Sequence, residues 1–301
     1  MSQFYYGAGL FLLKTMEVKT MKIYEYRGVR GLVYAPVTKD DSTGFTTGTV
    51  KPLAGVAEIS KTTESSNEAH YYDNLPAVVV SSTGSDEITI SASAIPYDVL
   101  ADITGQYYDA TTGMYVEKER ASRYFAIGYV TKTTDGTDMY VWRLKGTFNI
   151  PDQTNSTEND GTDANGQEIT YTGISTTYKF TKTNSPAKAI TVDSSKNATA
   201  ENTFFGSVQT PDTISAGTPS VSVVPSSASV DVGDTIALNA ITAPMGEAVT
   251  WSSSASTYAT VDNDGVVTGK AAGSATITAT ITVNGTDYTD TCAVTVNTPS
   301  A

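Results

Sequence analysis

Apolar and polar residues alternate along most of the chain in short runs, which Gly, Asp-Gly or Asn-Gly steps separate. Runs of this period, rich in Val, Ile, Thr and Tyr, are typical of β-strands with one face in a core. Asp135-Gly136 predicts a hairpin turn, because this dipeptide accepts the positive φ of tight turns. Up to residue 215 the pattern predicts strands over residues 31–37, 51–62, 68–74, 76–82, 86–94, 113–118, 123–132, 138–151 and 168–183. The fold is therefore predicted to be mainly β.

One short helix interrupts the strands at residues 95–104. Pro96 stands at an early helical position, apolar residues recur on one side, and Gly105 supplies the stop. Residues 38–50 and 152–167 are mostly polar and are predicted to be loops. Loops of this length are uncommon in a compact domain unless they bind something or become ordered on a partner.

The last part of the chain, residues 218–301, repeats the strand pattern with shorter runs and two strong turn signals, Asp264-Gly265 and Asn284-Gly285. Trp251 is predicted to be the centre of its core. The phrases at residues 250–252, 259–262, 265–269 and 273–279 resemble those of the bacterial immunoglobulin-like (Ig-like) domain of group 2. The resemblance implies a separate Ig-like β-sandwich over residues 221–297, preceded by a linker at residues 216–220.

Composition argues against catalysis and against binding to nucleic acid through charge. The chain has 19 Lys and Arg against 32 Asp and Glu, a net charge of −13, and a single histidine, His70. An acidic chain without a basic stripe repels phosphate. One histidine and one cysteine, Cys292, can form neither a catalytic triad with a histidine base nor a Cys/His metal site. We therefore expect no enzyme, no cofactor and no metal; residues 262–265 are interpreted as a turn, and Cys292 as a buried small hydrophobe.

No run approaches the roughly 18 apolar residues that a membrane span needs. The apolar stretch near the N-terminus lacks the basic region and the cleavage site of a signal peptide. We therefore expect no membrane contact and synthesis in a cytoplasm, which leaves two routes: the chain stays there, or it leaves inside an assembled particle. Residues 1–20 have two interpretations: an arm that orders on a neighbouring subunit, or an upstream start with Met16 or Met21 as the true beginning.

A series of phrases follows in order along the body of the chain, at residues 31–37, 54–59, 69–74, 91–105, 123–129, 140–148 and 171–175. In this order and spacing they resemble the major tail tube protein of long-tailed bacteriophages. The resemblance covers about residues 21–214 and implies a tail tube domain at residues 21–215, a β-sandwich with one flanking helix. It also implies a virion protein that forms hexameric rings, which stack into the hollow conduit for DNA delivery, with the Ig-like domain as an exterior decoration.

The partners implied are other copies of the chain, the tape measure and terminator proteins of the tail, and genomic DNA that passes the lumen without specific binding. An acidic lumen would let DNA slide, whereas basic side chains would hold it by releasing counterions. The same acidic charge makes the copies repel one another, so we expect salt to favour assembly.

Two segments are predicted to order on a neighbouring subunit. One is the loop at residues 38–50, with Asp41, Phe45 and Thr46; the other is the arm at residues 1–20, with Phe11 and Leu12. Deletion of residues 42–48 is expected to leave a folded monomer that no longer polymerises.

An alternative from another class is a bacterial surface or adhesion protein whose Ig-like domain binds carbohydrate. Within the tail interpretation, weak contact of that domain with host-surface glycans stays open; the sequence offers no aromatic platform beyond Trp251, Tyr258 and Tyr288, and Trp251 is expected in the core.

Overall fold

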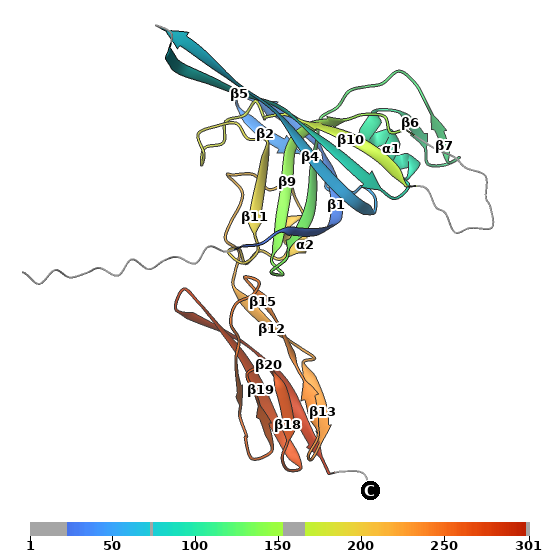
Figure 1. Ribbon diagram of the computed structural model, residues 1–301. Helices are drawn as coiled ribbons and strands as arrows, with labels where there is room; N and C mark the ends of the chain where they lie inside the picture. The colour runs from blue at the N-terminus through green and yellow to red at the C-terminus, as the bar shows by residue number, and fades with distance from the viewer. Residues whose placement is uncertain (1–22, 73–74, 153–165, 299–301) are drawn as a thin grey trace, which may run out of the picture.

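The computed structural model describes residues 23–72, 75–152 and 166–298, and the chain is mainly β, as predicted (Figure 1). The body of the chain is built on one nine-stranded sheet with the order β2-β1-β8-β9-β10-β5-β4, in which β3 also pairs with β1 and β11 with β9. Its strands are β1 (Tyr26–Asp41), β2 (Gly44–Thr47), β3 (Lys51–Pro52), β4 (Val56–Tyr72), β5 (Leu75–Ala92), β8 (Phe125–Thr133), β9 (Asp138–Phe148), β10 (Gln167–Gly173) and β11 (Ala189–Asp193).

The sheet has a hydrophobic core on each face of its central strands. On one face, β5 and β10 and the helix α1 (Tyr97–Thr104) enclose fully buried residues that include Ile88, Ile90, Phe125, Ile127 and Tyr171. On the other face, irregular chain and the short helix α2 (Glu201–Phe204) cover a second core that includes Ala126, Tyr140, Trp142, Phe180 and Phe204. Burial on both faces explains why β8 and β9 read as nearly continuous apolar runs.

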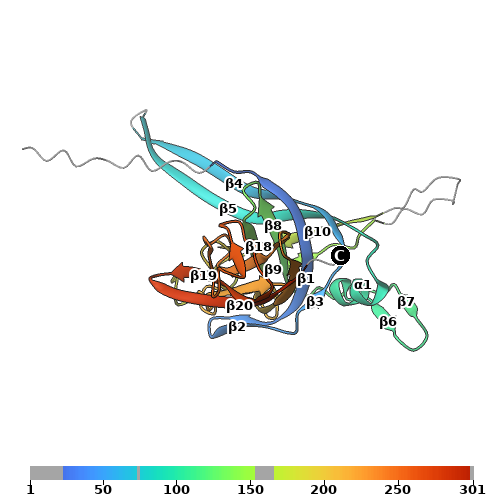
Figure 2. The same cartoon turned by 90° about the horizontal axis from the view of Figure 1, so that it is seen from below.

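The helix lies where the sequence predicts it. Pro96 precedes its first turn, and Gly105 ends it in the left-handed conformation, with φ 75°. A Cβ at Gly105 would collide with the backbone of Ala121, so only glycine fits there. The chain then forms a small hairpin of β6 (Tyr107–Asp109) and β7 (Met114–Val116) before it rejoins the sheet. This excursion and the β4–β5 hairpin leave the domain on opposite sides (Figure 2).

Three sequence predictions about this domain are wrong. Residues 38–50 are not a loop, because β1 continues to Asp41 and turns back into β2. The strands predicted over residues 68–74 and 76–82 are not separate: residues 68–72 and 76–82 form the far part of the single hairpin β4–β5, and residues 73–74 lie outside the described residues. The strand predicted over residues 168–183 ends at Gly173, and the chain that follows crosses the second core, where Phe180 is buried.

The C-terminal part is a second β-structure with its own core. Its strands are β12 (Ser220–Val224), β13 (Ser227–Asp231), β14 (Thr235–Ala237), β15 (Asn239–Ala243), β16 (Thr250–Ser253), β17 (Ala259–Val261), β18 (Val266–Gly269), β19 (Gly273–Val283) and β20 (Thr286–Asn297). Asn284 and Gly285 both have positive φ and connect β19 to β20, so the predicted hairpin turn is confirmed. Cys292 is fully buried, as predicted.

Trp251 does not lie at the centre of this core. It is half-buried and packs against the core from its edge, while Ala259, Val267, Ile277 and Ile281 are fully buried inside. The indole ring covers Gly265, where a Cβ would lie 2.9 Å from Trp251 Cζ2. Trp251 thus packs over the glycine turn at the edge of the core and does not fill its centre.

The two parts of the chain are joined by backbone hydrogen bonds as well as by the connecting segment. Met245 N donates to Ser194 O over 2.9 Å, and Ala198 N donates to Ala216 O over 2.7 Å. Asn197 Nδ2 also donates to Ser215 O. The turn after β11 therefore holds both the connecting segment and the β15–β16 loop of the C-terminal part.

Candidate functional site

The outer face of strands β4, β5 and β10 carries only hydroxyl and acidic side chains where these three strands pair with one another. The register brings three residues of each strand into a block of rows, and no member of the block is fully buried. The rows are Glu58–Ser91–Glu168, Ser60–Thr89–Thr170 and Thr62–Glu87–Thr172. We call these nine residues the Ser/Thr/Glu face; it contains three carboxylates and neither a cation nor an apolar residue.

The inner face of the same strands explains why the outer residues point away from the core. Successive strand residues point to opposite sides, so Ile59, Ile90 and Ile169 form a row directed into the first core. Ile90 and Ile169 are fully buried. Burial of this row makes a one-residue slip of register costly, and the outer face is thereby defined as well.

The β4–β5 hairpin continues beyond this block as two strands alone. Beyond Thr63 and Asp86, neither strand has a further partner within the described part of the chain, and the hairpin projects from the domain (Figures 1 and 2). Leu75, Val78 and Val79 are 67%, 49% and 62% exposed there. An isolated two-stranded hairpin is marginally stable in water, and exposed apolar side chains of this kind mark an interaction surface.

Charged groups hold the base of the hairpin against the body. Asp86 of β5 is buried and accepts hydrogen bonds from Arg143 Nη1 and Lys188 Nζ, each over 3.1 Å. Lys188 also donates to the backbone oxygen of Gly84. Burial alone would raise the pKa of Asp86, but the hydrogen bonds from Lys188 and Thr63 outweigh it, and the pKa lies below its usual value. The charged carboxylate thus fixes the direction in which the hairpin leaves.

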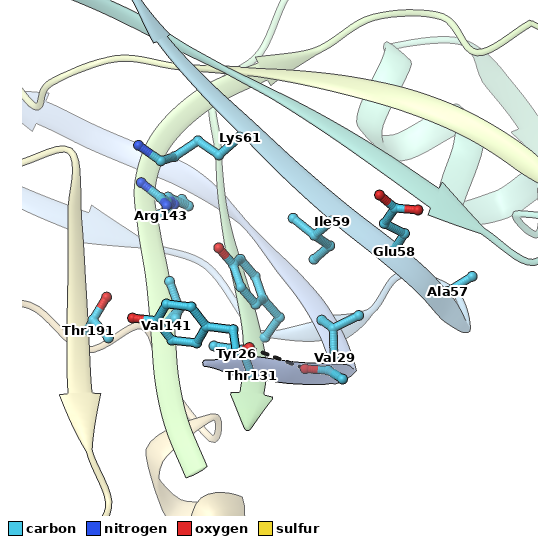
Figure 3. Close-up of a pocket in the computed structure, with 12 residues that line it drawn as sticks. Tyr26, Val29, Ala57, Glu58, Ile59, Lys61, Thr131, Val141, Arg143 and Thr191 are labelled. Atoms are coloured by element: carbon cyan, nitrogen blue, oxygen red, sulfur yellow. Dashed lines mark hydrogen bonds between the residues drawn. The ribbon is translucent and has the colours of Figure 1, made fainter. Parts of the chain in front are cut away.

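A hollow of about 520 Å³ opens between β1 and β4. Its walls include Tyr26 and Val29 of β1, Ile59 of β4, and Tyr129 and Val141 of the central strands. Lys61 and Arg143 lie together at one end of this β1–β4 hollow (Figure 3). Arg143 Nε is buried and has no hydrogen-bond partner among the described residues. The hollow therefore has largely apolar walls, with Lys61 and Arg143 at one end and the carboxylate of Glu58 also in its lining; Arg143 is paired with Asp86.

The predicted assembly residues of the first segment lie on the β1–β2 hairpin, which partly packs on the domain. Phe45 is half-buried, and its ring contacts that of Phe180 edge-on, with centroids 5.9 Å apart. Asp41 is exposed, and its Oδ1 accepts from the backbone N and the hydroxyl of Thr43, which holds the turn. Thr46 is exposed and bonds across the hairpin to Thr38. Deletion of residues 42–48 would thus also remove part of the packed domain, and the role of these residues in assembly stays a prediction.

The other predicted assembly residues, Phe11 and Leu12, lie outside the described residues. The Ser/Thr/Glu face, the hairpin projection and the β1–β4 hollow were not predicted from the sequence. The alternation at residues 86–94 signals one strand of the Ser/Thr/Glu face, but its neighbours β4 and β10 follow only from the three-dimensional pairing.

The other residues considered for chemistry, His70 and residues 262–265, do not form a site in the described part of the chain. His70 is exposed on β4. Asp262 Oδ1 accepts from the backbone N of Asp264 and of Val266, so residues 262–265 form the predicted turn. Over the residues that the structure describes, no three His, Cys, Asp or Glu side chains are grouped as metal ligands. In the same part of the chain, neither helix is long and apolar enough to cross a membrane.

Comparison with known families agrees with this architecture. A family model described as phage tail tube protein matches residues 16–209, and one described as bacterial Ig-like domain (group 2) matches residues 218–291. A search of curated proteins found no match. The first match supports the tail interpretation over the alternative of a bacterial surface protein. Because it covers well over half of the chain, the chain belongs to the phage tail tube protein family, a family of self-assembling structural proteins of the virion tail rather than of enzymes, and it carries a group 2 Ig-like domain after its tube domain.

Proposed function

We propose that copies of the chain form hexameric rings that stack into the hollow conduit for DNA delivery, with the Ser/Thr/Glu face toward the lumen. The observation that carries this proposal is the chemistry of that face. Its three carboxylates repel the phosphate backbone, and its hydroxyl groups hold water without offering a positive charge. No counterions are released when DNA passes such a wall, so the wall does not bind the DNA and does not retain it.

The free edge of β4 and the β4–β5 hairpin support the assembly part of the proposal. Within the described residues, β4 ends the sheet, and its outer edge pairs with no strand. An open edge is a template for pairing with another chain, and natural monomers usually cover or interrupt such edges. Pairing between copies at this edge would carry the sheet, and with it the Ser/Thr/Glu face, around a ring.

The remaining roles follow from position in such a tube. The Ig-like domain decorates the exterior, because it is attached at the end of the tube domain opposite to the outer part of β4 and β5 (Figure 1). Tape measure and terminator proteins are the proposed partners inside the tube and at its ends. Weak contact with host-surface glycans is proposed for the Ig-like domain, where Tyr258 offers a ring that is 41% exposed.

The test of the lumen assignment reverses the charge of the Ser/Thr/Glu face. Virions that carry Glu58→Lys, Glu87→Lys and Glu168→Lys together are expected to release DNA several-fold more slowly, because the wall then binds phosphate. The matched control is Asp234→Lys, Asp264→Lys and Asp287→Lys, which changes the net charge equally on exposed residues of the Ig-like domain. Equal release rates for the two triple variants would contradict the assignment.

A further inference from the structure

Each copy of the chain has a projecting apolar element and a separate hollow in which such an element would fit. The projecting element is the outer part of the β4–β5 hairpin, which we call the hairpin end and define as residues 64–72 and 75–84. The receiving surface is the β1–β4 hollow. Within the described part of the chain, the hairpin end has no third strand beside it, and no other segment fills the hollow.

The hairpin end is apolar on both of its faces. Val78 and Val79 are neighbours on β5, so their side chains point to opposite sides of the hairpin, and both are exposed. Contact with a flat surface would cover only one of them. Burial of both requires a concave site, and a hollow with apolar walls provides one.

Charge also matches the two surfaces. Between Lys61 and Lys118 the sequence contains no Lys or Arg, so the charged residues of the hairpin end, Glu64 and Glu68, are acidic. Glu68 lies two residues from His70, which pairs with Val78, so Glu68 shares a face of the hairpin with Val78. The hollow has Lys61 and Arg143 at one end, in a chain that is acidic as a whole; Arg143 is also paired with Asp86, and the lining includes the acidic Glu58.

The hairpin end cannot fill the hollow of its own copy. The hollow lies beside the base of the hairpin, where Lys61 lines it, and the paired strands run outward from there (Figures 1 and 3). About ten residues of strand separate the base from the turn, which is roughly 30 Å of extended chain. The occupant must come from a different molecule.

We propose that the hairpin end of one copy inserts into the β1–β4 hollow of a second copy. Val78 and Val79 pack between the walls formed by Val29, Ile59 and Val141, and Glu68 faces Lys61 and Arg143. Because donor and receiver are different surfaces of the same chain, the contact is head-to-tail, and its repetition closes a ring or extends a helix. This inference rests on the proposed self-assembly and names the surfaces through which it occurs.

The test uses single cysteines in a chain whose own Cys292 is fully buried. Copies with Val78→Cys are mixed with copies with Ile59→Cys, allowed to assemble, and treated with a short bis-maleimide. The matched control replaces Ile59→Cys by Ser60→Cys, the next residue on β4, which lies on the outer face instead of in the hollow. We expect several-fold more cross-linked dimer on a denaturing gel with Ile59→Cys than with Ser60→Cys.

Each outcome decides between the two proposals. Tubes that form without the Val78–Ile59 cross-link, or with equal cross-linking at Ser60, overturn the inference and leave the proposed function intact. Failure of the wild-type chain to form tubes under any condition overturns both. If Ile59→Cys does not fold, Val29→Cys offers a second position in the same hollow.

Charge exchange provides an independent readout. Lys61→Glu and Glu68→Lys are each expected to slow assembly several-fold, and the double variant to recover most of the rate, because the pair of charges is restored with opposite signs. Additive losses in the double variant would count against the insertion.

Discussion

Lys145 and Asp40 form a buried ion pair that ties the central strand β9 to the β1–β2 hairpin. Lys145 Nζ lies 2.5 Å from Asp40 Oδ2, and the two side chains are 10% and 5% exposed. The backbone N–H groups of Thr177 and Tyr178 donate to the same carboxylate. The pair therefore joins three segments that are distant in the sequence, and it makes the β1–β2 hairpin part of the folded domain.

Loss of Lys145 should destabilise the tube domain. Lys145→Met leaves the carboxylate of Asp40 buried without its cation, and we expect a loss of about 2 to 4 kcal/mol in the free energy of unfolding. Urea unfolding followed by circular dichroism measures it. The control is Lys39→Met, which breaks the exposed contact of Lys39 with Asp41, at 3.8 Å, and should leave the midpoint unchanged. Equal effects of the two variants would contradict the structural role of Lys145.

The tube domain should lose stability in acid. Burial would raise the pKa of Asp40, but hydrogen bonds from Lys145, Thr177 and Tyr178 keep it below the ordinary value of 3.8, and the pKa of Asp86 is lowered in the same sense. A carboxylate with a lowered pKa stabilises the fold above its ordinary pKa, and this stabilisation is lost as the pH falls. Melting temperatures should therefore be level down to about pH 5 and then fall toward pH 3. Asp40→Asn should melt lower at neutral pH and show a shallower fall.

The contact of Trp251 with the turn at Gly265 should make that glycine irreplaceable. Gly265 and Gly285 both have φ of 79°, but a Cβ would lie 2.7 Å from Leu238 O at Gly265 and in open space at Gly285. Gly285→Ala carries only the backbone strain, about 1 to 2 kcal/mol. Gly265→Ala adds a steric clash, and we expect about 1 to 3 kcal/mol more. Calorimetry of the Ig-like domain's transition in the full chain compares the two; similar losses would refute the steric argument.

The thiol of Cys292 should be unreactive in the native chain. Burial raises its pKa, so little thiolate is present, and its side chain is inaccessible. We expect almost no reaction with a thiol reagent at neutral pH in buffer, and one thiol per chain in denaturant. Rapid labelling of the native protein would show that β20 opens readily.

Salt should promote tube formation by the purified chain. The net charge of −13 repels every copy from its neighbours, whereas the proposed contact between Glu68 and Lys61 is a single pair worth less than about 1 kcal/mol. Screening removes more repulsion than attraction, so the overall repulsion decides the sign. Light scattering and electron microscopy across a salt series measure the effect, and assembly that weakens as salt rises would contradict it.

Sequence periodicity predicted the fold class, the helix before Gly105 and the hairpin turns, because each depends on neighbouring residues. It missed the long hairpin, since residues 63–67 and 81–86 are Ser, Thr, Asn, Gly and acidic residues that resemble turns when the pairing between β4 and β5 is unknown. It also made residues 38–50 a loop, because Phe45 finds its apolar partner more than a hundred residues later, in Phe180.

The candidate surfaces depended even more on distant pairing. Glu58 and Glu168 lie in one row only because β5 stands between β4 and β10. No local pattern specifies that neighbour. The hollow has no sequence signature at all, because its lining comes from β1, β4, β8, β9 and β11.

The hydrogen bond from Met245 to Ser194 helps to fasten one Ig-like domain to each tube domain. In a stacked tube, such domains would recur at a regular pitch along the whole tail. Binding energies of linked sites reinforce one another, so the weak glycan contact proposed for one domain would become avidity on a surface with repeated ligands.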